Sequence, residues 1–364
     1  MKKILLYAAV CLAFYGQSFA QGCVAIRSTG MMSCTMDHPE EEASAKGWQI
    51  NMAHRYFKSF RHFKGDEEQK ERLEKNTEVI NWQHSLDLSL LRHFNNRWSL
   101  SVGIPVLANK RSSLYEHGRT ERHSSGSAGI GDARIVGYRW LLDPQKASKG
   151  NLQLGLGMKL PTGNYNYKDT FYNVGPDGGP QERPVDQSIQ LGDGGVGAIT
   201  ELNGYYTLAS HWSTYGNVYY LFNPRGENGT RTFRETLSPP LRANEAITSV
   251  PDQYMVRLGV SHSFSGKLKG MVASVGARME GVPVEDAFGS SKGFRRPGYV
   301  QSVEPGLSYQ VNKVNFFAAV PVAFKRDRLQ SVTDKEATAQ TGTYTHGDAA
   351  FSDYAVNIGC SIKL

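Results

Sequence analysis

The strongest pattern along the chain is an alternation of large and polar side chains. Between Ile80 and Leu90 every second residue is large and, apart from one histidine, apolar, and the residues between them are polar. A period of two is typical of a β-strand with one apolar face. After Asn95 and Asn96 the alternation resumes at Trp98 and continues to position 106. The sequence therefore predicts a β-hairpin that turns at the two asparagines.

The same unit recurs along the rest of the chain. Four further hairpins are predicted, and a single strand stands at each end of the series, so we expect about twelve strands. The hairpins join 130–142 to 152–160, 196–208 to 212–222, 254–264 to 268–280 and 299–311 to 314–324, and the single strands cover 48–56 and 354–364. Most of these segments reach the length of about ten residues that a tilted strand needs to cross a bilayer.

The connections alternate between short turns and long loops, so the two kinds lie at opposite ends of the strands. The long ones, rich in glycine, proline, asparagine and charge, cover 65–77, 110–128, 163–191, 223–251, 282–298 and 327–349. Outer-membrane barrels have short periplasmic turns and long extracellular loops. We therefore predict an all-β fold over residues 46–364, a transmembrane antiparallel up-and-down β-barrel with this arrangement of turns and loops.

Proline marks the outward-running strand of each hairpin. We expect these strands to end at the prolines, because a residue without a backbone N–H is tolerated best at strand ends and bulges. The five residues are Pro105, Pro161, Pro224, Pro283 and Pro321.

The first twenty residues have the pattern of a secretory signal peptide. Lys2 and Lys3 precede an apolar run from 4 to 15, and small residues lead to Ala20. The run is too short to span a bilayer as a helix, so we expect export and cleavage after Ala20. Residues 21–45 then form a periplasmic N-terminal segment.

Two cysteines in this segment are candidates for a disulfide. Cys23 and Cys34 lie close in sequence, in a compartment that is oxidising. Two alternatives remain open. Cys23 is the lipidation site if the signal is that of a lipoprotein, and Cys34 with Met36 and His38 offers soft metal ligands, although a four-ligand spacing is not evident.

The C-terminus carries the most specific local signal. Large residues alternate from 354 to the final position, as in the terminal strand that the barrel-assembly machinery of the outer membrane recognises. We assign the assembly signal to Asn357, Gly359, Ile362 and Leu364, the last of which replaces the usual terminal aromatic residue.

The strand period directs ten charged residues toward the barrel lumen, where we expect charges on neighbouring strands to pair. They are Arg55, Asp87, Asp132, Arg134, Lys159, Glu201, Arg257, Arg278, Glu304 and Lys325. Two interpretations stay open: a salt-bridged interior that stabilises the barrel, and a path for a substrate. The net charge is +7, or +5 after Lys2 and Lys3 leave with the signal (7 − 2), which suits contact with anionic lipopolysaccharide or with anionic solutes.

The sequence contains no motif for enzymatic chemistry. A Gly-x-Ser-x-Gly elbow, a phosphate-binding loop and a His-Glu-x-x-His site are all absent from it, so we expect no catalytic residue, cofactor or metal. An outer-membrane lipid hydrolase is a less favoured alternative, because the lipid-facing histidines His54, His84 and His262 have no serine on the lipid face of neighbouring strands. Nothing beyond the modest charge favours nucleic-acid binding.

Three glycine-rich stretches carry a family resemblance. They are Gly129-Ile130-Gly131-Asp132, the run from Leu154 to Gly163, and Leu191-Gly192-Asp193-Gly194. Through them the chain resembles outer-membrane barrels of the phenol-degradation meta-pathway transporter family, which are similar in concept to FadL-type channels for hydrophobic compounds. The resemblance implies passage of a small, aromatic or otherwise hydrophobic molecule across the outer membrane. The rival interpretation is a structural or surface-interaction barrel with a closed lumen.

Overall fold

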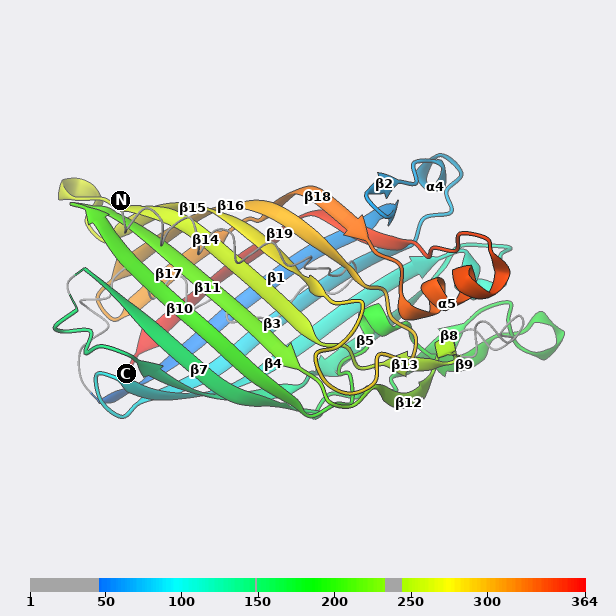
Figure 1. Ribbon diagram of the computed structural model, residues 1–364, viewed down its shortest axis with the longest axis horizontal. Helices are drawn as coiled ribbons and strands as arrows, with labels where there is room; N and C mark the ends of the chain where they lie inside the picture. Colours follow the sequence, from blue (N-terminus) through cyan, green and yellow to red (C-terminus); the bar gives the residue numbers. More distant parts are fainter. Residues whose placement is uncertain (1–45, 148, 233–243) are drawn as a thin grey trace.

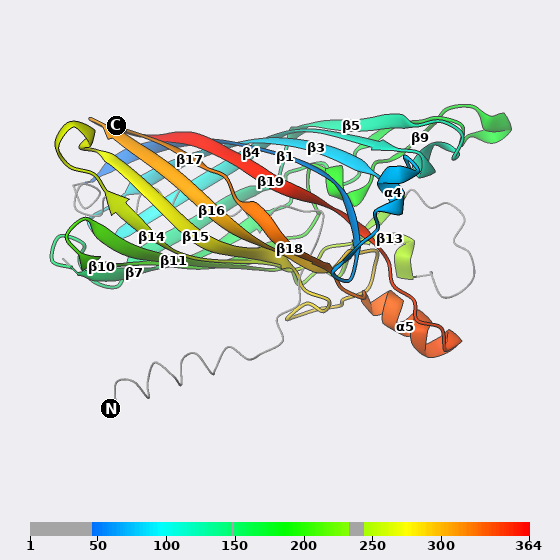
Figure 2. The same ribbon diagram turned by 90° about the horizontal axis from the view of Figure 1, so that it is seen from above.

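The computed structural model describes residues 46–147, 149–232 and 244–364. Its main sheet is antiparallel and closes on itself, because the first strand, β1 (Gly47–Lys64), pairs with β3 (Ile80–His93) on one side and with β19 (Ala349–Lys363) on the other. Figures 1 and 2 show the resulting barrel from two directions. A closed sheet leaves no unpaired edge, which a bilayer without hydrogen-bonding partners requires.

Twelve strands form the barrel wall in the described part of the chain, as predicted. Two of them are divided in two, the fourth into β5 (His123–Ile130) and β6 (Ala133–Trp140), and the eleventh into β17 (Val314–Ala319) and β18 (Val322–Arg328). The others are β4 (Trp98–Ser113), β7 (Gly150–Leu160), β10 (Gly197–Ala209), β11 (Trp212–Phe222), β14 (Gln253–Ser263), β15 (Met271–Val282) and β16 (Gly298–Val311).

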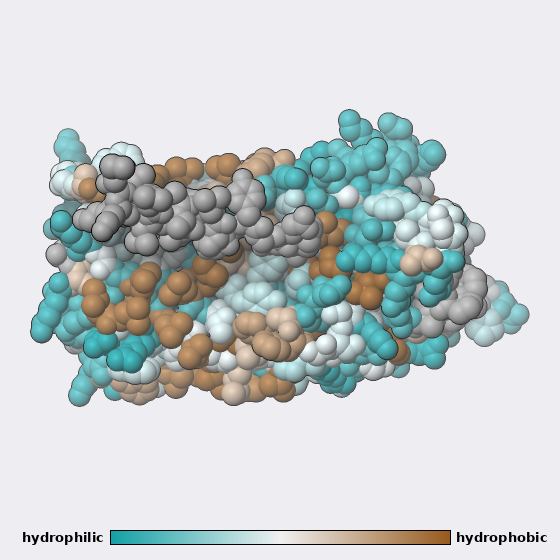
Figure 3. All heavy atoms as spheres, in the orientation of Figure 1, coloured by the Kyte–Doolittle hydropathy of each residue, from teal (hydrophilic) through white to brown (hydrophobic). Residues whose placement is uncertain are grey.

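The outer surface of the wall is apolar between two hydrophilic ends (Figure 3). Along β3 exposed and buried side chains alternate. Leu86 and Leu88 are 39% and 38% exposed, whereas Ser85, which precedes Leu86, is 8% exposed. Large side chains therefore face outward and polar ones face inward. This inversion of a soluble core is the arrangement expected of a barrel surrounded by lipid.

The two ends of the barrel differ. At one end the strands are joined by short turns, such as that after β3, where the Asn95 side chain accepts hydrogen bonds at 2.9 Å from the backbone N–H groups of Arg97 and Trp98. At the other end, called here the loop end, the connections carry additional elements (Figure 1). These are β2 (Glu67–Glu68), α4 (Glu71–Glu74), η1 (Tyr115–His117), β8 (Lys168–Phe171), η2 (Pro176–Gly178), β9 (Gln181–Pro184), η3 (Gln187–Ile189), β12 (Glu227–Arg231), β13 (Ile247–Ser249) and α5 (Val332–Thr341). Within the described residues, no helix has both the length and the apolar character that crossing a membrane demands.

The predicted loop over 110–128 is wrong. The ladder between β4 and β5 continues from Val106, paired with Ile130, to Ser113, paired with His123, so that only 114–122 connect the two strands. The apolar alternation ends near Val106 because the hairpin continues past the lipid-facing belt. Beyond that point backbone pairing holds the strands together without a need for apolar side chains.

One of the five prolines departs from expectation. Pro161 and Pro283 directly follow strands, Pro224 follows β11 after one residue and Pro321 lies in the break between β17 and β18, but Pro105 lies within β4. The Pro105 carbonyl accepts a hydrogen bond from the Gly131 N–H at 2.8 Å, beside the interruption between β5 and β6. The missing N–H of Pro105 therefore faces a place where the ladder is already broken.

The signal peptide, the segment 21–45 and the pair Cys23 and Cys34 lie outside the described residues and remain predictions. Within β19, Cys360 is a free thiol and half-buried. Gly359 sits where a Cβ atom would approach the Met52 carbonyl oxygen to 2.3 Å, so glycine is required there by close packing. The role of this strand as an assembly signal stays a prediction.

Candidate functional site in the barrel lumen

Nine of the ten charged residues assigned to the lumen point into the barrel. They are Arg55, Asp87, Asp132, Arg134, Lys159, Glu201, Arg257, Arg278 and Glu304, and each lines an interior cavity. All but Asp87 and Arg134 are buried by their overall exposure. Strand parity places eight of them there, because each lies an even number of residues from other inward positions on its own strand, whereas Asp132 lies in the interruption between β5 and β6.

Lys325 is the exception, and its assignment is corrected. In the pairing of β18 with β16, Ala323 lies opposite Ser302 and Lys325 lies opposite Gln301. Phe324 has no partner and is therefore an extra residue in β18. Such a bulge reverses the parity of the residues that follow. The Lys325 ammonium therefore lies on the outside, 5.6 Å from the centre of the Tyr299 ring.

A chain of ion pairs crosses the middle of the lumen. Glu304 accepts hydrogen bonds from Arg257 and, at 3.0 Å, from Arg278. Arg278 also pairs with Glu280 at 2.7 Å, and Glu280 reaches Arg55 at 3.4 Å. Because β1 and β15 are not neighbours in the sheet, the last contact bridges the interior. Glu280 is not among the lumen residues predicted from the sequence, although it has the same parity as Arg278.

Of the other inward charges, Lys159 and Asp132 pair with each other at 4.0 Å, and the rest meet aromatic or loop groups. The Arg134 guanidinium lies 6.0 Å from the Tyr219 ring centre, and the Tyr138 hydroxyl donates to Glu201 at 3.0 Å. Lys159 pairs with Asp193 of a loop. Buried apolar side chains pack among these polar groups, in a cluster of Leu91, Val136, Tyr138, Ile199, Tyr219, Leu221 and Met255. The lumen is therefore filled largely by side chains, as a small barrel permits.

A central cavity of about 100 Å³ remains in the middle of the barrel. Its lining combines small or apolar side chains, among them Ala53, Phe317 and Ala319, with four arginines and three carboxylates. Among the described residues, the Nε and Nη1 donors of buried Arg257 have no hydrogen-bond partner. Buried donors are normally satisfied, so the cavity beside Arg257 suits water or a polar group of a bound molecule.

A second cavity of about 80 Å³ lies toward the loop end. Its walls include Gln83, Lys159 and Asp193, and Arg134 lines both this loop-side cavity and the central one. The two cavities are therefore arranged in series along the lumen. The Arg134 side chain stands at their junction.

A loop segment, 186–193, covers the loop-side cavity from inside the barrel mouth. Inward-facing side chains of three strands hold its backbone: Gln83 donates to the Ser188 carbonyl at 2.9 Å, and Ser127 and Asn109 donate to the Ile189 carbonyl. We call this stretch the inserted segment. These contacts hold the segment against β3, β4 and β5, on the loop-end side of the cavity that it lines.

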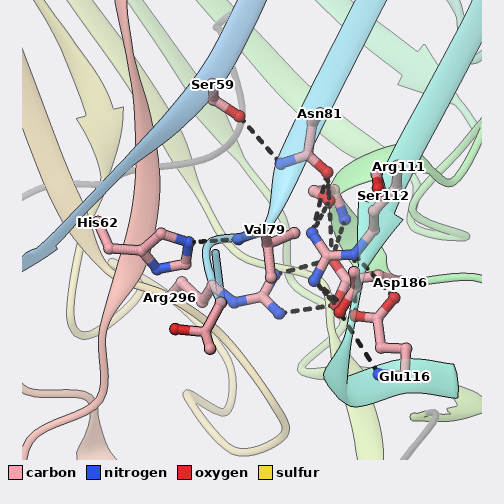
Figure 4. A network of polar contacts seen from close by, with 12 residues as sticks. Ser59, His62, Val79, Asn81, Arg111, Ser112, Glu116, Asp186 and Arg296 are labelled. Atoms are coloured by element: carbon pink, nitrogen blue, oxygen red, sulfur yellow. Dashed lines mark hydrogen bonds and ion pairs between the residues drawn. The ribbon is translucent and has the colours of Figure 1, made fainter. Parts of the chain in front are cut away.

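Asp186 anchors the inserted segment. Its side chain is fully buried, and Arg296 binds both of its carboxylate oxygens, at 2.9 and 2.6 Å. Arg111 lies 3.4 Å away and also binds Glu116 at 2.6 Å. Figure 4 shows the guanidinium groups of Arg111 and Arg296 directed toward Asp186. Burial raises the pKa of Asp186, but the two arginines and the Ser188 N–H outweigh it and hold that pKa well below its usual range.

The other end of the segment is fixed where the three glycine-rich stretches meet. Asp132 accepts hydrogen bonds from the N–H groups of Gly163, at 3.0 Å, and Asp193, at 3.1 Å. A Cβ atom on Gly192 would approach an Asp132 oxygen to 2.4 Å, and one on Gly163 would approach the Leu191 carbonyl oxygen to 2.7 Å. The glycines thus allow the loop backbone to pack against the end of β7. Sequence reasoning noted these stretches without finding that they converge.

Taken together, the closed wall, the lipid-facing belt and the interior cavities define a membrane β-barrel of the outer-membrane type. A crystal structure of an outer membrane channel from Pseudomonas putida F1 matches 88% of this chain and 97% of its own, with a TM-score of 0.57 and 10% sequence identity. At that identity the match shows the fold.

Other solved barrels match less well. The Pseudomonas putida toluene transporter TodX covers 95% of this chain and 96% of its own at 6% identity, with a TM-score of 0.42. The β-domain of the Bordetella autotransporter BrkA covers 88% and 100% at 13% identity, with a TM-score of 0.43. No family model and no curated protein matches the chain.

Proposed function

We propose that this barrel is an outer-membrane channel for small hydrophobic or aromatic molecules, and that the inserted segment closes it. The observation that carries the proposal is the series of two cavities below a loop held in the barrel mouth. A barrel with only a scaffolding role has no need of a loop anchored by a buried carboxylate and two arginines.

The central cavity favours a molecule that is partly apolar and partly polar. Phe317 offers apolar contact, and Arg257 offers unpartnered donors. A small aromatic compound with one polar substituent fits this division, because it satisfies the buried donors without placing a charge against the apolar wall. The P. putida structure with the same fold is described as an outer membrane channel, which is consistent with this role.

The proposal includes an orientation of the barrel in the outer membrane. We place the short turns in the periplasm and the loop end outside the cell, in contact with lipopolysaccharide, after insertion by the barrel-assembly machinery. Asn357, Gly359, Ile362 and Leu364 supply the assembly signal in this proposal. The nine inward charges line the path.

Uptake by cells tests the function. Phospholipid vesicles are themselves permeable to small aromatic compounds, so the measurement uses cells with an intact lipopolysaccharide layer, with and without the protein. We expect faster uptake of radiolabelled aromatic solutes in cells with the protein and no change for a disaccharide. Ala319→Phe, which fills the central cavity, should abolish the gain, whereas Val106→Phe on the lipid face should keep it. Equal uptake with and without the protein would contradict the proposal.

The rival function is a closed structural barrel that interacts through its loops. The ion-pair chain from Arg257 to Arg55 favours it, because it ties together strands that are not neighbours in the wall. This role predicts that no substitution in the inserted segment opens a passage without unfolding the barrel.

A further inference from the structure

Two lysines flank one tryptophan on the outer surface of the barrel. Lys58 on β1, Trp82 on β3 and Lys110 on β4 are direct cross-strand neighbours in the register. The two ammonium groups each lie 5.8 Å from the centre of the Trp82 ring. The indole ring therefore holds a positive charge on each side, through cation–π attraction.

Neither lysine has an ion-pair partner among the residues that the structure describes. Lys110 is exposed and Lys58 is half-buried, with its ammonium also 4.7 Å from the Phe60 ring centre. Two cations without acidic partners raise the local positive potential around the ring, and this potential attracts an anion from outside. The pair is thus a place where an external anion gains from both cations.

An open groove adjoins the pair: Trp82 and Lys110 line it, and Lys58 lies next to Trp82 on the neighbouring strand, at the rim. Tyr56, Trp82 and His84 form one side, and Tyr167 and Asp169 of the long loop form the other. The floor is made of small residues, Ala108, Gly126 and Ala128, so that it is hollow. Asp169 is an acidic residue in this lining; its two oxygens accept hydrogen bonds from the N–H groups of Gly126, at 2.6 Å, and Thr170, at 2.8 Å, so its carboxylate is held on the loop side and leaves the lysines without an acidic partner.

The groove lies at the border between the apolar belt and the loop end. Two positions from Ala108 toward the short turns, the neighbouring strands expose Leu86, Val106 and Ile130, at 39%, 40% and 56%. A molecule in the groove therefore has cations and aromatic rings at one end and an apolar wall at the other. Aromatic and basic residues at such a border are typical of contacts with lipid headgroups.

We propose that this groove binds the phosphorylated headgroup of a lipid A type glycolipid of the outer leaflet, with its acyl chains along the belt. A phosphate monoester carries close to two negative charges, which matches two unpaired lysines better than the single charge of a phospholipid diester. The inference rests on the proposed function in one respect, the placement of the loop end outside the cell.

Native mass spectrometry of the full-length protein in detergent tests the site. The probes are bisphosphorylated lipid A, the same lipid without phosphates, phosphatidylglycerol and inorganic phosphate. We expect bisphosphorylated lipid A to bind best and Lys58→Gln/Lys110→Gln to weaken it by roughly thirtyfold, from about 1 kcal/mol for each lysine. Lys58→Arg/Lys110→Arg should retain binding. The control Arg92→Gln/Arg139→Gln removes two cations stacked on Trp48 and Trp98 at the other end, and should leave binding unchanged.

Several results would overturn the proposal. One is lipid A binding by the glutamine variant that equals that of the unchanged protein. Another is an equal loss of binding in the Arg92 and Arg139 control. The third is an affinity for phosphatidylglycerol, dephosphorylated lipid A or inorganic phosphate that equals the affinity for bisphosphorylated lipid A. Heat-dependent gel mobility shows whether each variant is folded, and the arginine variant tests the charge if the glutamine variant is not. Lipid A binding is measured on the purified protein, whereas solute uptake and loop exposure are measured on cells. Failure of the channel function or of the orientation is therefore distinguishable from failure of the lipid site.

Discussion

Glu304 joins two arginines in the lumen, so its neutralisation is a sensitive perturbation of the ion-pair chain. Its side chain is 4% exposed, and those of Arg257 and Arg278 are 6% and 5% exposed. In Glu304→Gln, Arg278 retains Glu280, but Arg257 loses the carboxylate that it contacts. An arginine left without its partner in a buried site costs about 3–5 kcal/mol. We expect a value near 3 kcal/mol, because glutamine still accepts one hydrogen bond.

Urea unfolding in detergent micelles, followed by tryptophan fluorescence, measures this change in the free energy of unfolding. Glu285→Gln is the matched control, since Glu285 is 70% exposed and lies 3.9 Å from Lys335. An exposed pair of this kind contributes about 0.5 kcal/mol or less. A loss below about 1 kcal/mol in Glu304→Gln would show that water from the central cavity screens the network, and the expected cost of a buried arginine without its carboxylate would be refuted.

Three further predictions concern regions outside the central network. An epitope tag after Gly342 should be labelled on intact cells and one after Gly266 should not; the opposite result would invert the barrel. Burial, then the neighbouring His123 and Arg111, lower the pKa of His117 to about 4, so the folded loop end loses stability as pH falls from about 6.5 toward 4. An NMR titration of His117 with a midpoint near 6.5 would contradict this. Cys23 and Cys34 should remain unalkylated in protein treated without reductant, as measured by intact mass. Alkylation of both thiols, or the mass of a lipid on Cys23, would exclude the disulfide.

The strands could be predicted because lipid imposes a requirement on every second residue. Leu86, Leu88 and their equivalents must be apolar, and the resulting alternation is visible in the sequence. Where β4 and β5 extend past the lipid, Lys110 and its neighbours are under no such requirement. The extension of the hairpin to Ser113 therefore had no signal in the hydrophobic pattern.

The lumen could be predicted only as far as parity is preserved. Arg257 and Arg278 follow the period of their strands, but the extra residue Phe324 turns Lys325 outward. The sequence pattern around Phe324 does not indicate that bulge. Asp186 was not found because its partner Arg296 is 110 residues away and both lie in loops. A contact of that kind depends on how the barrel brings loops together, which local sequence does not encode.

The central claim, a channel closed by the inserted segment, is tested most directly by the ion conductance of Asp186→Asn in planar bilayers. Loss of the Asp186 charge weakens the anchor by about 3 kcal/mol, which favours the open state roughly a hundredfold. The matched control is Asp177→Asn, in the same loop at an exposed position with a φ of 61°. We predict frequent, long openings in Asp186→Asn and rare ones in Asp177→Asn and the unchanged protein. Folded Asp186→Asn barrels that conduct no more than the control would contradict the account.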